Sequence, residues 1–344
     1  MSAARETTRG RPAAEILRWS RALLDPALRA AVGELSGEMR GIAEYHFGWR
    51  DAAGGPADAP AGKAVRPALA FLAAEAVGGG AADAVPAAVA IELAHNFSLL
   101  HDDVMDGDTE RRHRATAWSL FGATPAVLAG DALLACAVEG LAADTVGGPA
   151  VRTFGRAVRE LVEGQSADIS FERRADVTLA ECEAMAAKKT GALIGGACAL
   201  GAIFGGGSPA RVARLRGFGE RVGLAFQIVD DLLGIWGDAA VTGKPVHSDL
   251  VNRKKSLPVV AALTSGTSEA AELAALYHRA EPLAAPDAAR AADLVARAGG
   301  RAWANARAAE LRAEALTELD AAAPAPSVRD DLAELARLLT DRDH

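Results

Sequence analysis

The chain has 344 residues, half of them hydrophobic, and a formal net charge of −8 at pH 7. An acidic chain of this composition has no overall positive field, which argues against nucleic acid and anionic lipid as partners. Its three cysteines are widely spaced and support neither a disulfide framework nor a structural zinc site, so we expect a cytoplasmic protein.

No low-complexity linker divides the chain, so we expect one domain over residues 13–344, preceded by a disordered tail over residues 1–12. Helical periodicity dominates and strand signals are nearly absent, which predicts an all-α fold. Over Ala13–Ala43 this periodicity predicts one or two amphipathic helices with a break near Pro26. The most apolar segment, Gly191–Gly207, is shorter than the roughly 20 residues of a membrane helix, so we expect no membrane span.

A loop over residues 51–62, rich in Gly and Pro, leads to the sequence GKAVRP (Gly62–Pro67) at the start of the next helix. Free amide groups and the helix dipole favour an anion at such a start. Lys63 and Arg66 are three residues apart and would add two positive charges on one side of the first turn. Alternatively, they are two ordinary surface cations.

An apolar run over Ala84–Leu100 predicts a buried helix, and the acidic cluster that follows it sits where this helix reaches solvent. The cluster, His101–Arg112, has four carboxylates within seven residues and ends in two arginines. Asp102 and Asp106 are four apart and share one helix face. Gathered carboxylates indicate Mg²⁺, and the arginines indicate a diphosphate as its other ligand. The alternative for this motif alone is a solvated, salt-bridged helix end.

Two histidines lie on the same predicted helix, but His95 and His101 are six apart and are not stacked as metal ligands at i and i+4 would be. Hydrogen-bonded histidines at the core or its rim are the simpler interpretation. Phe97 and Ser98 precede Asp102 by five and four residues, so they lie about one turn deeper on the same face. Plain core packing explains Phe97 equally well when it is considered alone.

In the second half of the chain, a second pair of aspartates ends another apolar segment, FQIVDD, at Asp230 and Asp231. Before it, Lys189 and Thr190 directly precede the apolar Gly/Ala helix, where an ammonium group would be poorly solvated without an anion. After it, the segment Ala239–Ser256 has weak periodicity and several cations, which suits a mobile basic flap over phosphates. From Thr267 onward the helices read as scaffold.

These ordered blocks, from GKAVRP through DDVMD, the arginine pair, KT and FQIVDD to the lysines at 244 and 254, resemble the trans-prenyltransferases, or isoprenyl diphosphate synthases. The resemblance implies a single-domain helical bundle around a central cavity. It also implies a homodimer that joins isopentenyl diphosphate to an allylic diphosphate. An N-terminal stretch through Tyr45–Trp49 is similar to bacterial members that travel as encapsulin cargo.

The resemblance assigns roles to individual positions. Metal binding, with three Mg²⁺ ions per active site, falls to Asp102, Asp106 and Asp230. The residues implied for catalysis are Asp102, Asp103, Asp106, Arg111, Lys189, Thr190, Gln227, Asp230 and Lys244. Those implied for substrate binding are Lys63, Arg66, His95, Arg111, Arg112, Lys189, Thr190, Gln227, Lys244 and Lys254. Phe97 and Ser98 are implied to close the pocket floor, with Phe97 typical of geranylgeranyl synthases, although a farnesyl product stays open.

Gly234 departs from the family pattern, because it stands where a third aspartate of the second motif is usual. We expect activity to survive with weaker metal affinity. Two alternatives remain. A terpene cyclase would need a late Asn, Ser/Thr and Glu metal motif, which the sequence lacks. A non-catalytic subunit or shell cargo would be expected to lose the aspartates, whereas DDVMD is intact.

Overall fold

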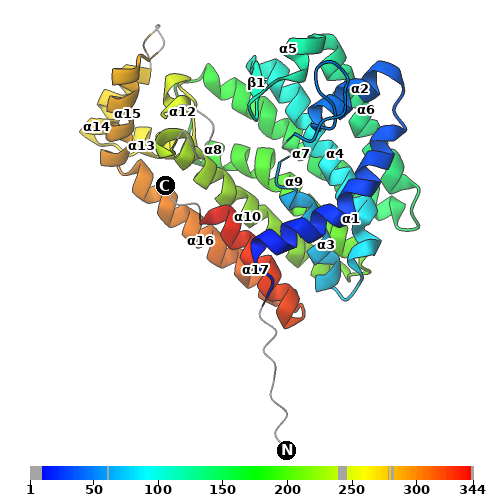
Figure 1. Cartoon of the computed structure of the whole chain (residues 1–344). Coiled ribbons are helices and arrows are strands. Elements are labelled where there is room, and N and C mark those ends of the chain that lie inside the picture. Colours follow the sequence, from blue (N-terminus) through cyan, green and yellow to red (C-terminus); the bar gives the residue numbers. More distant parts are fainter. Residues whose placement is uncertain (1–9, 60–61, 239–245, 278, 280–282, 342–344) are drawn as a thin grey trace, which may run out of the picture. The chain divides into compact units, whose positions relative to one another are not determined.

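The computed structural model describes residues 10–59, 62–238, 246–277, 279 and 283–341 (Figure 1). Lys244 and most of the predicted tail lie outside these residues. The chain forms two compact units. The first unit comprises Met1–Arg156, Gly196–Arg216 and Glu318–Leu335, and the second comprises Ala157–Gly195, Gly217–Thr317 and Ala336–His344.

The fold is all-α, as the sequence predicts. Helices wholly within the first unit are α1 (Ala13–Gly33), α2 (Gly37–His46), α3 (Val65–Ala76), α4 (Val85–Asp106), α5 (Ala117–Phe121) and α6 (Ala123–Ala142), with the 3-10 turn η1 (Ala81–Ala84). Those wholly within the second unit are α8 (Leu179–Ala186), the π-helical turn η2 (Ala187–Gly191), α12 (Ser248–Val251), α13 (Leu257–Leu263), α14 (Ser268–Tyr277) and α15 (Ala285–Arg297). The residues of α7 (Gly147–Glu172), α9 (Ala192–Phe204), α10 (Pro209–Trp236), α16 (Gly300–Ala321) and α17 (Pro326–Thr340) are divided between the units.

Helix α1 runs through Pro26, so the predicted break there is wrong. The proline costs the helix one hydrogen bond. Leu24 and Leu28, on either side of it, are both buried on one stripe, and their burial holds the helix continuous. The chain breaks instead after Gly33, before α2 begins at Gly37. Arg11, within the predicted tail, donates its backbone N–H to Asp331 at 2.6 Å and pairs with the same carboxylate.

Helix α4 forms the centre of the first unit and packs against α1, α3 and α6. Its side chains from Ala87 to Leu100 are largely buried, and the acidic cluster occupies its last turns, ending at Gly107 in the left-handed conformation. Its contact with α6 is close because Gly130 has no side chain. A Cβ there would lie 2.6 Å from the His101 ring. The same kind of contact joins α9 to α3, since a Cβ on Gly201 would lie 2.0 Å from the carbonyl oxygen of Ala70.

A short hairpin follows α4 and was not predicted. Strands β1 (Glu110–Arg111) and β2 (Arg114–Ala115) are antiparallel. Their turn residues, Arg112 and His113, have φ values of 54° and 60°. Two-residue hairpins of this handedness normally use Asn or Gly, because other residues are strained at positive φ. The hairpin therefore holds Arg112 in a conformation that its own side chain disfavours.

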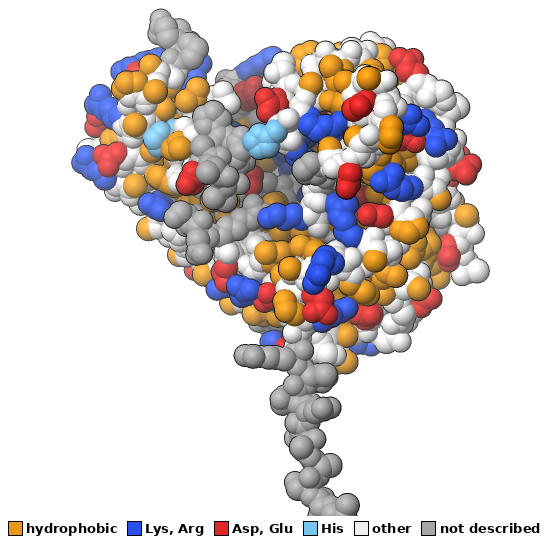
Figure 2. All heavy atoms as spheres, in the orientation of Figure 1, with side chains coloured by type: hydrophobic (Ala, Val, Ile, Leu, Met, Phe, Trp, Pro, Cys, Tyr) orange, Lys and Arg blue, Asp and Glu red, His pale blue; other side chains and the backbone are white. Residues whose placement is uncertain are grey.

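Two apolar cores lie among the described residues of the second unit. One joins α8 and α10 to α16 through residues such as Cys182, Ile228 and Leu311. The other is built from α12 to α15, drawn in yellow and orange in Figure 1, around residues such as Leu250 and Leu273. On the face drawn in Figure 2, cationic, anionic and hydrophobic side chains are interspersed.

Helix α6 is apolar but only partly buried. Among the described helices it is the one long and apolar enough to cross a membrane, and a third of its most apolar window is buried. Core helices of soluble proteins can be equally long and apolar. Its exposed apolar residues include Leu128, which is 51% exposed, and Val138, which is 38% exposed.

Candidate active site

A basic cluster in the first unit surrounds the start of α3. Arg66 is the second residue of this helix, which follows Ala64 in the left-handed conformation. The Nε of Arg66 is buried and has no hydrogen-bond partner among the described residues. Lys63 lies exposed just before the helix. A buried guanidinium nitrogen without an acceptor is costly, so this position favours an added anion.

Two further arginines reinforce this charge. Burial lowers the pKa of Arg66, and the guanidinium of Arg112 lowers it further, while Glu92 raises it. Burial and then Arg111 likewise lower the pKa of Arg112. Guanidinium groups this close repel one another, and a diphosphate would relieve the repulsion through charge-assisted hydrogen bonds.

Two histidines beside the arginines are neutral at pH 7. Burial lowers the pKa of His46 to about 3, with Arg112 adding to the effect. Burial, followed by Arg66 and Arg112, lowers the pKa of His95 well below its usual range. His46 also has a buried Nε2 without a hydrogen-bond partner among the described residues. A neutral imidazole can donate a hydrogen bond without adding charge, so both rings suit the rim of an anion site.

The hairpin of β1 and β2 lines a small pocket of about 20 Å³, which has room for about one water molecule. Its lining residues are Tyr45, His46, Asp103, Arg111, Arg112, Arg114, Ala115, Thr116 and Ala117. The guanidinium groups would have to separate to admit a diphosphate.

The first acidic motif divides its aspartates between solvent and core. Asp106 is exposed and Asp102 is partly exposed, whereas Asp103 is buried. Asp103 accepts from Arg111 Nε at 2.7 Å and pairs with its Nη2 at 2.6 Å. Burial raises the pKa of Asp103, and the Arg111 hydrogen bond opposes that rise. Asp103 therefore orients Arg111, while the other two carboxylates face outward from α4.

The predicted floor residues lie on α4 one turn deeper. The Phe97 ring is nearly buried and meets the His101 ring edge-on at 4.6 Å between centroids. His101 in turn is fixed to α6, with Nε2 3.0 Å from the carbonyl oxygen of Val127. Ser98 is also buried and donates to the carbonyl of His95 at 2.8 Å. The contact between His101 and Phe97 could not be predicted from the sequence, because the position of the His101 ring depends on Gly130 in α6.

In the second unit, the π-helical turn η2 presents the KT pair. Lys189 pairs with Asp168 of α7 at 2.5 Å. Thr190 donates to Gln227 Oε1 at 2.5 Å, so the KT and FQIVDD blocks lie together. Asp168 is not among the predicted site residues. The π-turn itself was missed, because a one-residue bulge leaves no signal in a periodic pattern.

The second acidic motif, like the first, has one aspartate exposed to solvent and the next one buried. Asp230 is exposed and Asp231 is buried. Asp231 accepts from Gln227 at 2.8 Å and from the backbone N–H of Leu257 at 2.9 Å. Burial raises the pKa of Asp231 to about 6, although Lys254, 3.9 Å away, lowers it. Asp231 thus joins α10 to the start of α13.

Lys254 lies among several carboxylates. Burial alone would lower its pKa, but Asp231, Asp249, Asp168 and Asp230 together outweigh burial and raise it. Lys254 therefore stays charged and offsets part of the negative charge of the second motif.

The carboxylates of both motifs suit Mg²⁺ in kind. Among the described residues no three His, Cys, Asp or Glu side chains are arranged to hold a metal alone. Mg²⁺ is usually held by one or two carboxylates together with waters and substrate phosphates. Within each unit the outward carboxylates suit that mode: Asp102 and Asp106 in the first motif, and Asp230 in the second.

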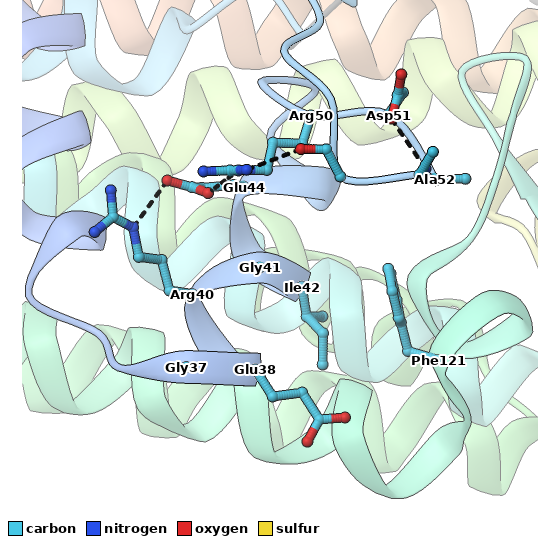
Figure 3. A pocket seen from close by; sticks show the side chains of 12 residues that line it. Gly37, Glu38, Arg40, Gly41, Ile42, Glu44, Arg50, Asp51, Ala52 and Phe121 are labelled. Atoms are coloured by element: carbon cyan, nitrogen blue, oxygen red, sulfur yellow. Dashed lines mark hydrogen bonds and ion pairs between the residues drawn. The ribbon is translucent and has the colours of Figure 1, made fainter.

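A larger pocket lies elsewhere in the first unit. It measures about 590 Å³ and lies between α2, the loop over residues 50–54 and Phe121 (Figure 3). Arg40 and Arg50 flank Glu44 and already neutralise it. None of the predicted site residues lines this pocket, so it is not the candidate active site.

Comparisons with known proteins show which family the chain resembles. The sequence profile of the polyprenyl synthetase family matches residues 57–294. A (2E,6E)-farnesyl diphosphate synthase of Mycobacterium tuberculosis is 48% identical over 83% of this chain and 81% of its own length. A geranylgeranyl diphosphate synthase of the same organism is 45% identical over 95% of this chain and 93% of its own.

Solved structures give the same result. A polyprenyl synthetase from Streptomyces coelicolor has a TM-score of 0.92 at 46% identity, covering 95% of this chain and 99% of its own. A geranylgeranyl pyrophosphate synthase from Corynebacterium glutamicum, solved with isoprenyl diphosphate and magnesium, has a TM-score of 0.81 at 26% identity. It covers 96% of this chain and 99% of its own. With its motifs in family order, its all-helical fold and a family profile matched over most of its length, the chain belongs to the polyprenyl synthetase family.

Proposed function

We propose that the protein is a trans-prenyltransferase that condenses isopentenyl diphosphate with an allylic diphosphate, giving farnesyl or geranylgeranyl diphosphate. The observation that carries this proposal is the basic cluster of the first unit. There Arg66 and His46 each have a buried nitrogen without a partner among the described residues, beside two more guanidinium groups. The relatives, named as synthases, give no support to a terpene cyclase, a non-catalytic subunit or an encapsulin cargo protein.

Isopentenyl diphosphate would bind at Lys63, Arg66 and Arg112. Arginine suits this task because its fork matches phosphate oxygens in pairs. His95 and His46 remain neutral and can donate hydrogen bonds at the rim. The bound diphosphate would place the double bond of the substrate for attack, which saves the entropy of a bimolecular encounter.

The allylic diphosphate would bind at Arg111, Lys189 and Lys254, and at Lys244, which lies outside the described residues. Mg²⁺, with three ions proposed at Asp102, Asp106 and Asp230, would supply Lewis-acid stabilisation of the diphosphate as its carbon–oxygen bond breaks. Thr190 and Gln227, joined by their hydrogen bond, would present oxygen dipoles toward the carbocation. The departing diphosphate can take the final proton, so the chain need not supply a general base.

Geranylgeranyl diphosphate is the product we propose, because Phe97, the residue proposed to close the pocket floor, is held in place by a neighbouring ring. Its ring is clamped by His101, which is itself fixed to the α6 backbone. A phenyl ring packed against the fixed His101 ring would resist swinging aside for a longer chain, whereas a ring without such a contact could move. Ser98 leaves the adjacent position small.

Product analysis tests this function. The purified protein, Mg²⁺ and isopentenyl diphosphate are incubated with dimethylallyl, geranyl or farnesyl diphosphate, and products are measured by mass spectrometry. We expect elongation that ends at geranylgeranyl diphosphate and is lost in Asp102→Ala. Products ending at farnesyl diphosphate would support the prenyltransferase activity but refute the proposal that Phe97 closes the pocket floor. No elongation from any primer would refute the function.

We also propose a homodimer in the cytoplasm. Helix α6 exposes Leu128 and Val138, and α5, which contacts α6, exposes Leu120. We propose that these side chains belong to one apolar face. A second copy of the chain would cover that face. None of the three cysteines forms a disulfide, which fits a reducing compartment.

A further inference from the structure

The position of Gly234 on α10 is filled from another helix. A Cβ added to Gly234 would lie 2.4 Å from Oδ2, 2.5 Å from Cγ and 2.8 Å from Oδ1 of Asp249. These distances are far below van der Waals contact. The carboxyl group of Asp249 therefore occupies the space that a side chain at position 234 would need.

Helix α12 holds Asp249 in this place. The buried Leu250 anchors α12 in the apolar core of the second unit. The backbone N–H of Lys254 donates to the carbonyl of Asp249 at 2.8 Å, which closes the turn after the helix. The Ser248 hydroxyl lies 3.5 Å from the carbonyl oxygen of Gly234. The residues on both sides of Asp249 thus fix α12 against the end of α10.

Asp249 shares its surroundings with the second acidic motif. It raises the pKa of both Asp231 and Lys254, which places its charge close to both groups. Asp231 is committed to Gln227 and the Leu257 amide, and is buried. The partly exposed Asp249 and the exposed Asp230 are the motif's outward carboxylates.

We propose that Asp249 supplies, from α12, the carboxylate that the second motif lacks at position 234, and so completes the acidic site that holds magnesium and diphosphate at Asp230. This inference rests on the proposed function. It explains the glycine: a side chain at position 234 and the present position of the Asp249 carboxylate exclude each other. The two residues form one exchangeable pair.

Four proteins test the pair: the wild type, D249A, G234D and the double variant G234D/D249A. Binding of Mg²⁺ is measured by calorimetry in the presence of inorganic pyrophosphate, and the midpoint of thermal unfolding is measured without ligand. D249N is added because it keeps the shape of the side chain. D293N, which alters an exposed carboxylate on α15, is the matched control.

We expect D249A and D249N to weaken Mg²⁺ binding about 10-fold, the scale typical of residues that support a metal site. G234D should lower the unfolding midpoint, because its side chain meets the Asp249 carboxylate. The double variant should recover both the midpoint and most of the Mg²⁺ affinity, since it moves one carboxylate from α12 to α10. D293N should match the wild type.

The inference is overturned if D249N binds Mg²⁺ and pyrophosphate as the wild type does, or if the G234D and D249A effects simply add. The wild type separates this failure from failure of the proposed function. A wild type that elongates allylic diphosphates while D249N keeps full Mg²⁺ affinity would refute only the role of Asp249. A wild type that neither elongates nor binds Mg²⁺ with pyrophosphate would refute both.

Discussion

Arg66 and Arg112 differ from ordinary surface cations in what surrounds them. Each has a pKa lowered by burial and by a neighbouring guanidinium, so each carries its charge at a cost that an anion removes. Lysine keeps the charge but loses the paired donors. We expect Arg66→Lys to raise KM for isopentenyl diphosphate about 10- to 100-fold, the equivalent of a lost charge-assisted hydrogen bond.

Steady-state kinetics with each substrate varied in turn would check this. KM for the allylic diphosphate should change much less, and Arg159→Lys, at an exposed position on α7, should leave both values unchanged. Equal increases in both KM values for Arg66→Lys would contradict the assignment of Arg66 to isopentenyl diphosphate.

His46 links the same cluster to acid stability. Its pKa is about 3 in the folded protein and about 6.5 when unfolded. Between these values the unfolded chain binds one more proton, so this contribution to stability is complete above pH 6.5 and decreases as the pH falls toward 3. The contribution changes by at most about 1.4 kcal/mol per pH unit.

Denaturant unfolding of the wild type and of His46→Gln at pH 7.5 and 5 would measure it. The wild type should lose more stability than His46→Gln on acidification, whereas His113→Gln, at an exposed position of the hairpin turn, should follow the wild type. An identical pH dependence for His46→Gln and wild type would show that His46 is not buried as described.

At the scale of elements, helix packing depends on glycines that the sequence does not distinguish. A Cβ on Gly201 would meet the Ala70 carbonyl at 2.0 Å, while one on Gly155 in α7 would meet nothing within 4 Å. We expect Gly201→Ala to destabilise the protein by about 1–3 kcal/mol through overpacking. Gly155→Ala should stabilise it by about 0.5–1 kcal/mol, since alanine is the better helix former. The unfolding midpoint of each variant is compared with that of the wild type. Changes in the same direction for both variants would contradict this prediction.

Features that depend on helical periodicity and on local side-chain chemistry could be predicted from the sequence. The anion site that we propose at the start of α3 can be inferred from the sequence, because free amides occur at every helix start and Lys63 and Arg66 add positive charge there. The burial of Arg66 against Glu92 could not be predicted, since it depends on how α3 meets α4. Likewise, two adjacent aspartates look equivalent in a sequence, and only tertiary packing makes Asp231 the buried one.

Other elements escaped prediction for local reasons. Pro26 reads as a helix break, yet burial on both sides of it outweighs one lost hydrogen bond. The Arg112–His113 turn uses residues that rarely adopt positive φ, so the hairpin had no turn signal. The contact of Asp249 with Gly234 joins positions that are separate in sequence and meet only through α12.

At the scale of the whole molecule, the proposed dimer accounts for the apolar face of α6. Light scattering coupled to size exclusion should give twice the chain mass of 35.3 kDa. Leu128→Glu should shift the protein to a monomer, because a charge at the centre of an apolar interface is costly to bury. A wild type that remains monomeric at all concentrations would refute the homodimer. Binding of that monomer to lipid vesicles would then indicate that the apolar face meets a membrane surface.

The shared division of the two acidic motifs, one aspartate outward and the next one buried, has a consequence for genetics. In a library of all single substitutions, scored once for cellular abundance and once for product formation, the two kinds of position should separate. Changes at Asp103 and Asp231 should lower both scores, because they break buried ion pairs and hydrogen bonds. Changes at Asp102 and Asp230 should lower product formation alone. Adjacent residues of one motif would then be under two different selective pressures, one on the amount of folded enzyme and one on its catalytic activity.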